Sequence, residues 1–177
     1  MTALFERLGE HEVPWAEVDT WQVDERVAPA GSPDRNLTHQ LRALPAGATR
    51  DLRPMPVEEE DLDAAAAHYA AGLPGAFDVV HLGLGADGHT ASLVPGDPIL
   101  EIRERSVGVT GPYEGRRRMS LTYPGLALAA RAVWLVTGVE KRDAVRRLLA
   151  GDPSIPASGV NMAAQVLVLD ADAMPEA

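Results

Sequence analysis

Asp78-Val-Val-His-Leu-Gly-Leu-Gly-Ala-Asp-Gly-His-Thr-Ala-Ser-Leu-Val-Pro95 is the stretch of sequence that decides the fold. Its apolar beginning predicts a β-strand over residues 77–82, and the strand runs into a loop that contains three glycines, Gly83, Gly85 and Gly88. The loop places Asp87 and His89 at the expected carboxyl end of that strand. Open α/β sheets bind their ligands at this end of the strands, so the stretch predicts a site as well as a fold.

Apolar patterns on both sides of this stretch alternate between strands and helices. Further strands are predicted over 18–23 (ending on Asp24-Glu25-Arg26), 107–110, 119–122, 132–137 and 165–169. Helices are predicted over 2–9, 36–44 (capped by Asn36), 57–73 (with an acidic first turn), 124–130 and 140–150 (with Val145, Leu148 and Leu149 facing inward), and residues 45–56 are predicted to be a loop or an extended passage. This alternation predicts a single α/β domain over residues 1–177, with a mostly parallel sheet covered by helices on both faces.

Composition excludes several classes of function. The formal net charge of −10 argues against nucleic-acid or membrane-surface binding, because phosphate backbones are bound through basic stripes. The chain has no cysteine, which excludes disulfides, thiolate zinc sites and a cysteine nucleophile. No apolar run is long enough to span a bilayer and the amino terminus has no export pattern, so a cytoplasmic location is expected.

The glycine loop admits three interpretations. Gly83-Leu-Gly-Ala-Asp-Gly88 matches the dinucleotide fingerprint G-x-G-x-x-G, but Pro95 and Pro98 leave no room for the crossover helix that this fingerprint requires. A metal site would need Asp87, His89 and His81, yet no histidine-rich cluster completes it. The third interpretation is a general base, in which a carboxylate sets the tautomer or basicity of His89 and the glycines let a ligand approach the backbone.

Four stretches, in this order along the chain, resemble the 6-phosphogluconolactonase family within the glucosamine-6-phosphate isomerase superfamily. They are 21–29 with Asp24-Glu25-Arg26, 83–95 with Asp-Gly-His-Thr-Ala-Ser, 118–122 with Arg-Met-Ser-Leu-Thr, and 137–141 with Thr-Gly-Val-Glu-Lys. The similarity covers essentially the whole chain, and the run that follows His89 distinguishes the lactonases from the isomerase/deaminase branch. The resemblance implies the NagB/RpiA/CoA transferase-like fold.

The resemblance also implies an activity, the hydrolysis of 6-phospho-D-glucono-1,5-lactone to 6-phosphogluconate in the oxidative pentose phosphate pathway, without metal or cofactor. His89 would be the general base that activates water, and Asp87 would orient its ring. Arg26, Arg118 and Lys141, the sole lysine of the chain, would lie near the phosphate or ring oxygens, with Gly85 and Gly88 close to the substrate. Two alternatives stay open, an amino-sugar-phosphate isomerase/deaminase and a non-catalytic sugar-phosphate-binding protein.

The chain differs from the family pattern at its front. Relatives of this kind begin with two βα units, the second led by a Gly-Gly-Ser/Thr-Pro phosphate-binding turn, and Met1 falls just inside the helix that follows this turn. The expectation is that about sixty residues are missing, at about thirty per unit. We therefore predict that the 177-residue chain hydrolyses the lactone poorly and that a form extended upstream is active.

Overall fold

The computed structural model describes residues 2–49 and 51–176, and its architecture is α/β as predicted. The helices are α1 (Thr2–Gly9), α2 (Asn36–Ala43), α3 (Leu62–Gly72), α4 (Tyr123–Leu126) and α5 (Arg142–Leu149). The strands are β1 (Thr20–Trp21), β2 (Asp24–Arg26), β3 (Leu52–Arg53), β4 (Val80–Leu82), β5 (Val107–Val109), β6 (Arg118–Leu121), β7 (Ala132–Val136) and β8 (Gln165–Leu169). Residue 50 of the predicted 45–56 loop lies outside the described residues, as do the first and last residues of the chain.

Within residues 2–49 and 51–176 the strands form three small sheets. Two of them are parallel, β1 with β3 and the ordered set β4, β7, β8. The third is antiparallel, with β6 between β2 and β5. Sequence periodicity did not predict this mixture, because strand direction depends on long-range pairing and not on the local apolar pattern.

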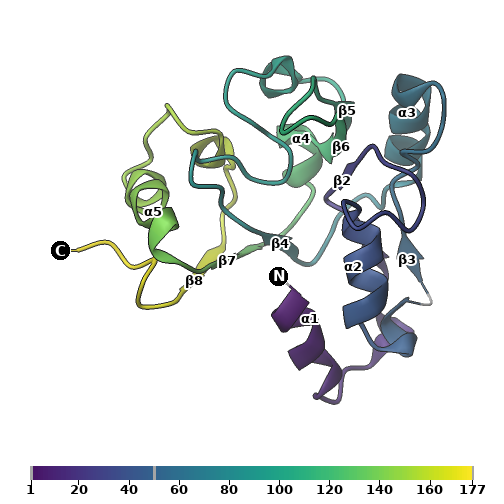
Figure 1. Ribbon diagram of the computed structural model, residues 1–177, viewed down its shortest axis with the longest axis horizontal. Helices are drawn as coiled ribbons and strands as arrows, with labels where there is room; N and C mark the ends of the chain where they lie inside the picture. The colour runs from purple at the N-terminus through teal and green to yellow at the C-terminus, as the bar shows by residue number, and fades with distance from the viewer. Residues whose placement is uncertain (1, 50, 177) are drawn as a thin grey trace.

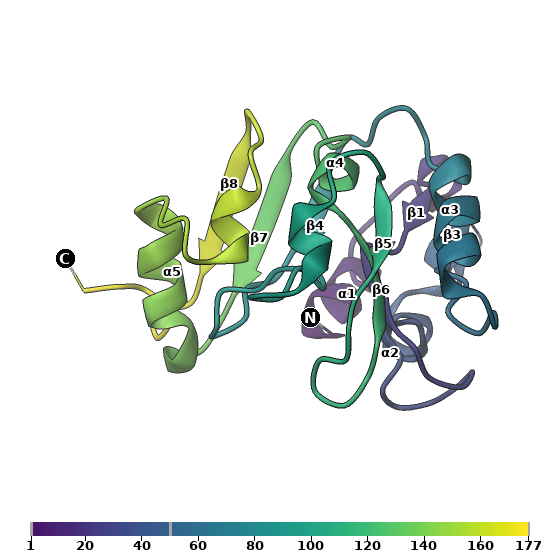
Figure 2. The same cartoon turned by 90° about the horizontal axis from the view of Figure 1, so that it is seen from above.

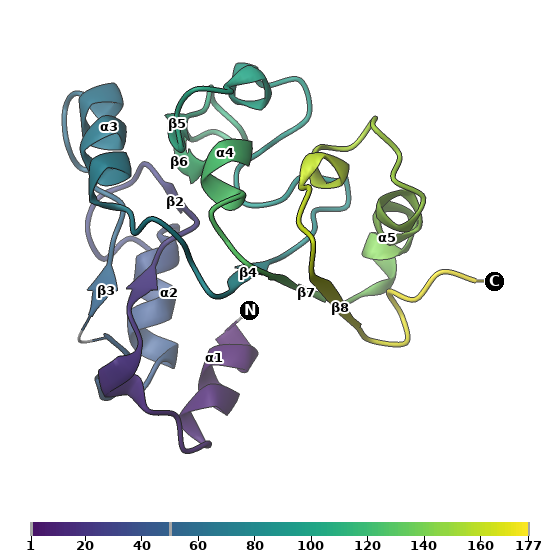
Figure 3. The same cartoon turned by 180° about the vertical axis from the view of Figure 1, so that it is seen from behind.

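Helices cover one face of the β4–β7–β8 sheet more completely than the other. Helices α4 and α5 lie over one face, whereas α1 lies below the sheet beside β4 (Figure 1; Figure 3). Ala132, Trp134 and Val136 are accordingly buried, but Val166 and Val168 on the opposite face are 50% and 45% exposed. The expected coverage on both faces is therefore complete on one side only, since α1 reaches just the β4 end of the other.

A cavity of about 580 Å³ separates β1 from β4 and is lined by residues of both strands. Strand β1 uses one edge for β3, where the N–H groups of Thr20 and Gln22 donate to the carbonyls of Asp51 and Arg53, both at 3.3 Å. Main-chain groups alternate in direction along a strand, so those of Trp21 face the cavity. Figure 2 shows the β1 and β3 strands on one side of the molecule and β4, β7 and β8 on the other. The cavity is the seam between these two parts.

Several element boundaries differ from the sequence prediction. The strand predicted over 18–23 is split, because β1 pairs with β3 while the following residues of β2 turn to pair with β6. Helix α3 starts at Leu62 and not at residue 57, since the Asp61 carboxylate accepts a hydrogen bond from the Ala64 N–H at 3.0 Å and caps the helix there. Leu149, predicted to face inward, is 64% exposed.

Candidate active site

The glycine loop after β4 is closed by its own hydrogen bonds. The Gly85 N–H donates to the His89 carbonyl at 2.8 Å, and the Gly88 N–H donates to the Gly85 carbonyl at 2.9 Å. The Thr90 hydroxyl donates to the Gly83 carbonyl at 2.8 Å. A turn and then a 3₁₀ helix over Pro98–Glu101 follow the loop. The crossover helix of a dinucleotide site is therefore absent from residues 90–101.

Asp87 and His89 form a hydrogen-bonded pair at the rim of the cavity. The His89 Nδ1 lies 2.6 Å from Asp87 Oδ1, which also accepts the His89 backbone N–H at 3.1 Å. Burial raises the pKa of Asp87, but the hydrogen bonds from His89 and from a tyrosine described below outweigh it and leave this pKa below its usual value. An ionised Asp87 holds the proton of His89 on Nδ1, which leaves Nε2 as the basic nitrogen.

The two glycines named for the site act through the space that they leave. A Cβ on Gly85 would lie 2.1 Å from His89 Nδ1 and 2.5 Å from Asp87 Oδ1. Gly88 has a φ of +86° and a Cβ there would lie 2.4 Å from the side chain of Ile155. Both N–H groups donate within the loop, so neither is free to bind a ligand, and Gly85 leaves room for the Asp87–His89 pair while Gly88 leaves room for Ile155.

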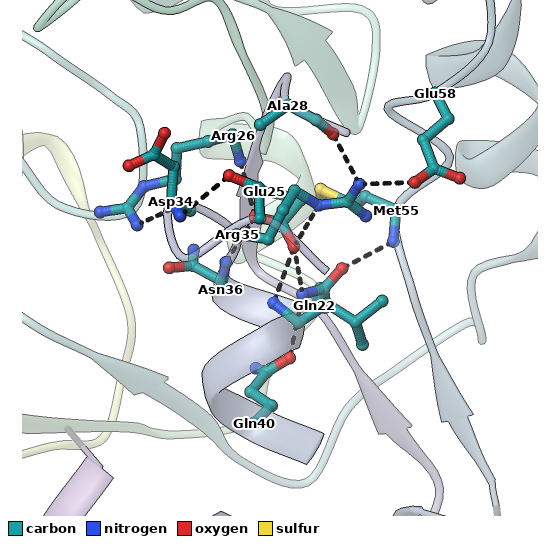
Figure 4. A network of polar contacts seen from close by, with 12 residues as sticks. Gln22, Glu25, Arg26, Ala28, Asp34, Arg35, Asn36, Gln40, Met55 and Glu58 are labelled. Atoms are coloured by element: carbon teal, nitrogen blue, oxygen red, sulfur yellow. Dashed lines mark hydrogen bonds and ion pairs between the residues drawn. The ribbon is translucent and has the colours of Figure 1, made fainter. Parts of the chain in front are cut away.

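The opposite wall of the site is built around a buried glutamate. Glu25 is fully buried and its carboxylate accepts the N–H groups of Arg26, Asn36 and Leu37 at 2.7, 2.7 and 2.8 Å (Figure 4). Glu25 therefore caps α2, the role that was predicted from the sequence for Asn36. Asn36 is the first residue of the helix, and its amide donates to the main chain and carboxylate of Asp24.

Side chains alternate along a strand, so the inward direction of Glu25 turns Asp24 and Arg26 toward the cavity. Both residues line it. Burial raises the pKa of Asp24, opposed by a hydrogen bond from Ser92 and by the charges of Arg26 and Arg118. The Ser92 hydroxyl donates to Asp24 Oδ2 at 2.7 Å, which ties the two walls of the site together and makes this serine a structural hydroxyl.

Three cationic side chains reach the same cavity from three elements, namely Arg26 on β2, Arg118 on β6 and Lys141 before α5. Arg26 and Arg118 are directly opposite in the antiparallel ladder, where two like charges repel each other. The Nε atoms of both are buried and have no hydrogen-bond partner in the described part of the chain, while Arg26 Nη1 donates to the Asp34 carbonyl and Arg118 Nη2 to the Glu114 carboxylate. Such a cluster suits an anion.

Tyr113 completes the site, and sequence reasoning missed it. It lies in the β5–β6 connection, and its hydroxyl donates to Asp87 Oδ2 at 2.9 Å. The Arg118 guanidinium stacks over its ring at 4.7 Å from the centroid. No local signal could have identified it, because Tyr113 and Asp87 are 26 residues apart and meet only through strand pairing.

The metal-site interpretation finds no support in residues 2–49 and 51–176, where no group of three histidine, aspartate or glutamate side chains could hold an ion. The His81 ring packs at 6.4 Å from the Phe5 ring, in surroundings whose burial lowers its pKa. It is thus directed toward α1 and away from Asp87. In the described part of the chain no helix is long and apolar enough to cross a membrane.

Fold and site together define an α/β protein with a cavity lined by cationic side chains at the carboxyl ends of its parallel strands, beside a carboxylate–imidazole pair. Comparison with known proteins agrees with this assignment of the fold. A model of the family described as glucosamine-6-phosphate isomerases/6-phosphogluconolactonase matches residues 1–169. The chain belongs to this family.

Individual relatives are similar over most of the chain. The 6-phosphogluconolactonase of Streptomyces coelicolor is 38% identical, over 89% of this chain and 69% of the relative. That of Mycobacterium tuberculosis is 37% identical, over 92% of this chain and 74% of the relative. The crystal structure of 6-phosphogluconolactonase from Thermotoga maritima superposes with a TM-score of 0.84 at 24% identity, over 95% of this chain and 79% of that one, and supports the fold.

Proposed function

We propose that the protein hydrolyses 6-phospho-D-glucono-1,5-lactone to 6-phosphogluconate. The observation that carries the proposal is the shared cavity, because the Asp87–His89 pair and the cations of Arg26, Arg118 and Lys141 all line it or its rim. A lactone that carries a phosphate needs a base at one end and positive charge at the other. In a chain of net charge −10 the positive charge must be supplied locally.

In the proposed reaction His89 Nε2 takes a proton from a water molecule, whose oxygen attacks the lactone carbonyl carbon. The tetrahedral adduct then collapses, the bond from this carbon to the ring oxygen breaks, and the imidazolium returns its proton to the departing oxygen. Water and lactone give the open carboxylic acid, and the base is restored. Asp87 stabilises the imidazolium that forms in between and stays ionised throughout.

The arginine pair is proposed to hold the phosphate. Arg118 is only 5% exposed in its side chain and is therefore fixed, with Glu114 at 2.7 Å. Its planar donor group and that of Arg26 can each offer two N–H groups to a phosphate. Lys141 follows β7, whose carboxyl end lies at the same edge of the sheet as that of β4, and it is proposed to contact ring or phosphate oxygens.

Hydrolysis of the lactone by the purified chain and by a form extended upstream tests the proposal, with spontaneous hydrolysis subtracted. We expect His89→Ala to lower the enzymatic rate by about 100-fold or more while 6-phosphogluconate still binds in calorimetry. His68→Ala, which changes an exposed histidine on α3, is the matched control and should leave the rate unchanged.

Two results would contradict the proposal. Deamination of glucosamine 6-phosphate in place of lactone hydrolysis would assign the chain to the other branch of its family. Binding of 6-phosphogluconate with a rate that is the same in wild type and His89→Ala would indicate a binding protein without catalysis. Placement in the oxidative pentose phosphate pathway follows from the proposed reaction, and a cytoplasmic location stays a prediction from the sequence.

A further inference from the structure

We propose that Tyr113 is a positioning residue of the site, which fixes the Asp87–His89 pair through its hydroxyl and holds Arg118 under its ring. The inference rests on the proposed function for its effect on turnover. Its structural part, the orientation of Asp87 and His89, can be measured without substrate.

The turn that carries Tyr113 is closed by two hydrogen bonds between its ends. The Tyr113 N–H donates to the Arg116 carbonyl at 2.9 Å, and the Arg116 N–H donates back to the Tyr113 carbonyl at 3.2 Å. Between them Glu114 and Gly115 have φ values of +50° and +80°. Two consecutive central residues with positive φ are typical of a type I′ hairpin turn, the connection that best matches the twist of paired strands. The hairpin therefore fixes where the Tyr113 side chain points.

The hydroxyl of Tyr113 completes the hydrogen bonding of the Asp87 carboxylate. Oδ1 accepts the ring N–H and backbone N–H of His89, so it is the Tyr113 hydroxyl at 2.9 Å that holds Oδ2 and prevents rotation of the carboxylate. Burial and the neighbouring Asp87 raise the pKa of Tyr113 to about 12. The hydroxyl is consequently a donor at every pH at which the enzyme would be assayed.

The ring of Tyr113 faces the anion-binding half of the site. Arg118 stacks on it at 4.7 Å from the centroid, and Glu114 of the same hairpin pairs with this guanidinium at 2.7 Å. The Tyr113 side chain thus contacts both the Asp87–His89 pair and Arg118, so the effect of a substitution at Tyr113 can be divided into the loss of its hydroxyl and the loss of its ring. In the described part of the chain, Asp87 and Tyr113 contact His89 directly, and the other charged or titratable groups lining the cavity are Asp19, Asp24, Arg26, His39, His81, Arg118 and Lys141.

Tyr113→Phe removes the hydroxyl and keeps the ring. Without this donor the Asp87 carboxylate can rotate away from His89 Nδ1 and stabilises the imidazolium less, so the acid limb of the kcat/KM profile should move to lower pH by about 0.3 to 1 unit. The plateau should fall about three- to tenfold, and 6-phosphogluconate affinity should change less than twofold. Nitrogen-15 NMR of the histidine rings, recorded without substrate, should show a smaller fraction of the Nδ1–H tautomer of His89.

Tyr113→Leu removes the ring as well and should also weaken 6-phosphogluconate binding, by about three- to tenfold, through the loss of the contact with Arg118. Tyr123→Phe is the matched control, since it removes a hydroxyl that donates to the Pro156 carbonyl at 2.8 Å, outside the cavity lining. It should leave the acid limb and the His89 tautomer unchanged.

An unchanged acid limb and unchanged tautomer in Tyr113→Phe would overturn the proposal and leave Tyr113 a packing residue of the hairpin. Failure of lactone hydrolysis both in this chain and in a form extended upstream would contradict the proposed function, whereas the tautomer measurement would still decide the role of Tyr113.

Discussion

At the scale of single residues, the site depends on Gly85 having no side chain. Gly85 leaves the space in which the His89 ring meets Asp87, since a Cβ would lie 2.1 Å from the ring nitrogen. Residue spacing alone predicted the Asp87–His89 pair, because both partners lie in one short loop. Tyr113 could not be predicted because Asp87 is 26 residues away, and the buried carboxylate of Glu25 could not because it meets the start of α2 only through tertiary packing.

Gly85→Ala should therefore damage activity more than stability. We expect kcat/KM for lactone hydrolysis to fall about 100-fold, because the added methyl displaces the His89 ring. The free energy of unfolding should fall by about 1 to 3 kcal/mol. Rate assays and urea denaturation measure the two effects.

Gly75→Ala is the comparison variant, because a Cβ at Gly75 meets no atom within 4 Å. It should leave both quantities nearly unchanged. A Gly85→Ala variant with wild-type kcat/KM would mean that the ring of His89 does not need the position seen here.

At the scale of elements, the site depends on how β2 and α2 meet. The Glu25 carboxylate accepts the first N–H groups of α2 and pairs with the buried Arg35 at 3.2 Å, while Arg35 also donates to the Ala28 carbonyl (Figure 4). The sequence predicted the helix and a cap by Asn36, following the usual preference for short polar residues. Tertiary structure replaced that local cap with a charged one from a neighbouring strand.

Glu25→Gln should destabilise the fold by about 3 kcal/mol, because it removes one of the two carboxylates that pair with the buried Arg35, leaving only Glu58, and turns an amide donor toward the N–H groups of α2. Urea denaturation measures this loss. Glu59→Gln, at an exposed position before α3, is the control and should change the free energy of unfolding by less than about 0.5 kcal/mol. Equal effects of the two substitutions would contradict the capping role.

At the scale of the whole molecule, alternating strands and helices predicted the α/β class correctly, as did the resemblance to the family. The division into three small sheets was not predictable, because short strands such as β1 and β3 have only two residues each and carry no periodicity. The uncovered face of the β4–β7–β8 sheet, with Val166 and Val168 exposed on it, is a feature whose effect can be measured in solution. Exposed aliphatic side chains on a sheet face favour self-association.

Val166→Thr combined with Val168→Thr should shift the onset of self-association to a protein concentration about tenfold higher, since two buried methyl groups contribute about 1.6 kcal/mol to a contact. Light scattering across a concentration series measures the onset. Leu149→Gln removes a similarly exposed aliphatic residue from α5 and should have little effect. An unchanged onset in the double variant would place the self-associating surface elsewhere.

The cavity between β1 and β4 couples two parts of the molecule. Arg26 lies on one side of it and His89 on the other, and the Ser92–Asp24 hydrogen bond of 2.7 Å connects the two sides. A bound sugar phosphate would contact both sides of the cavity, and binding would stabilise the arrangement in which the two sides are close together. Opening of the cavity and ligand affinity are then coupled: the coupling can be observed as slowed hydrogen exchange in β1 and β4 on binding, alongside the dissociation constant.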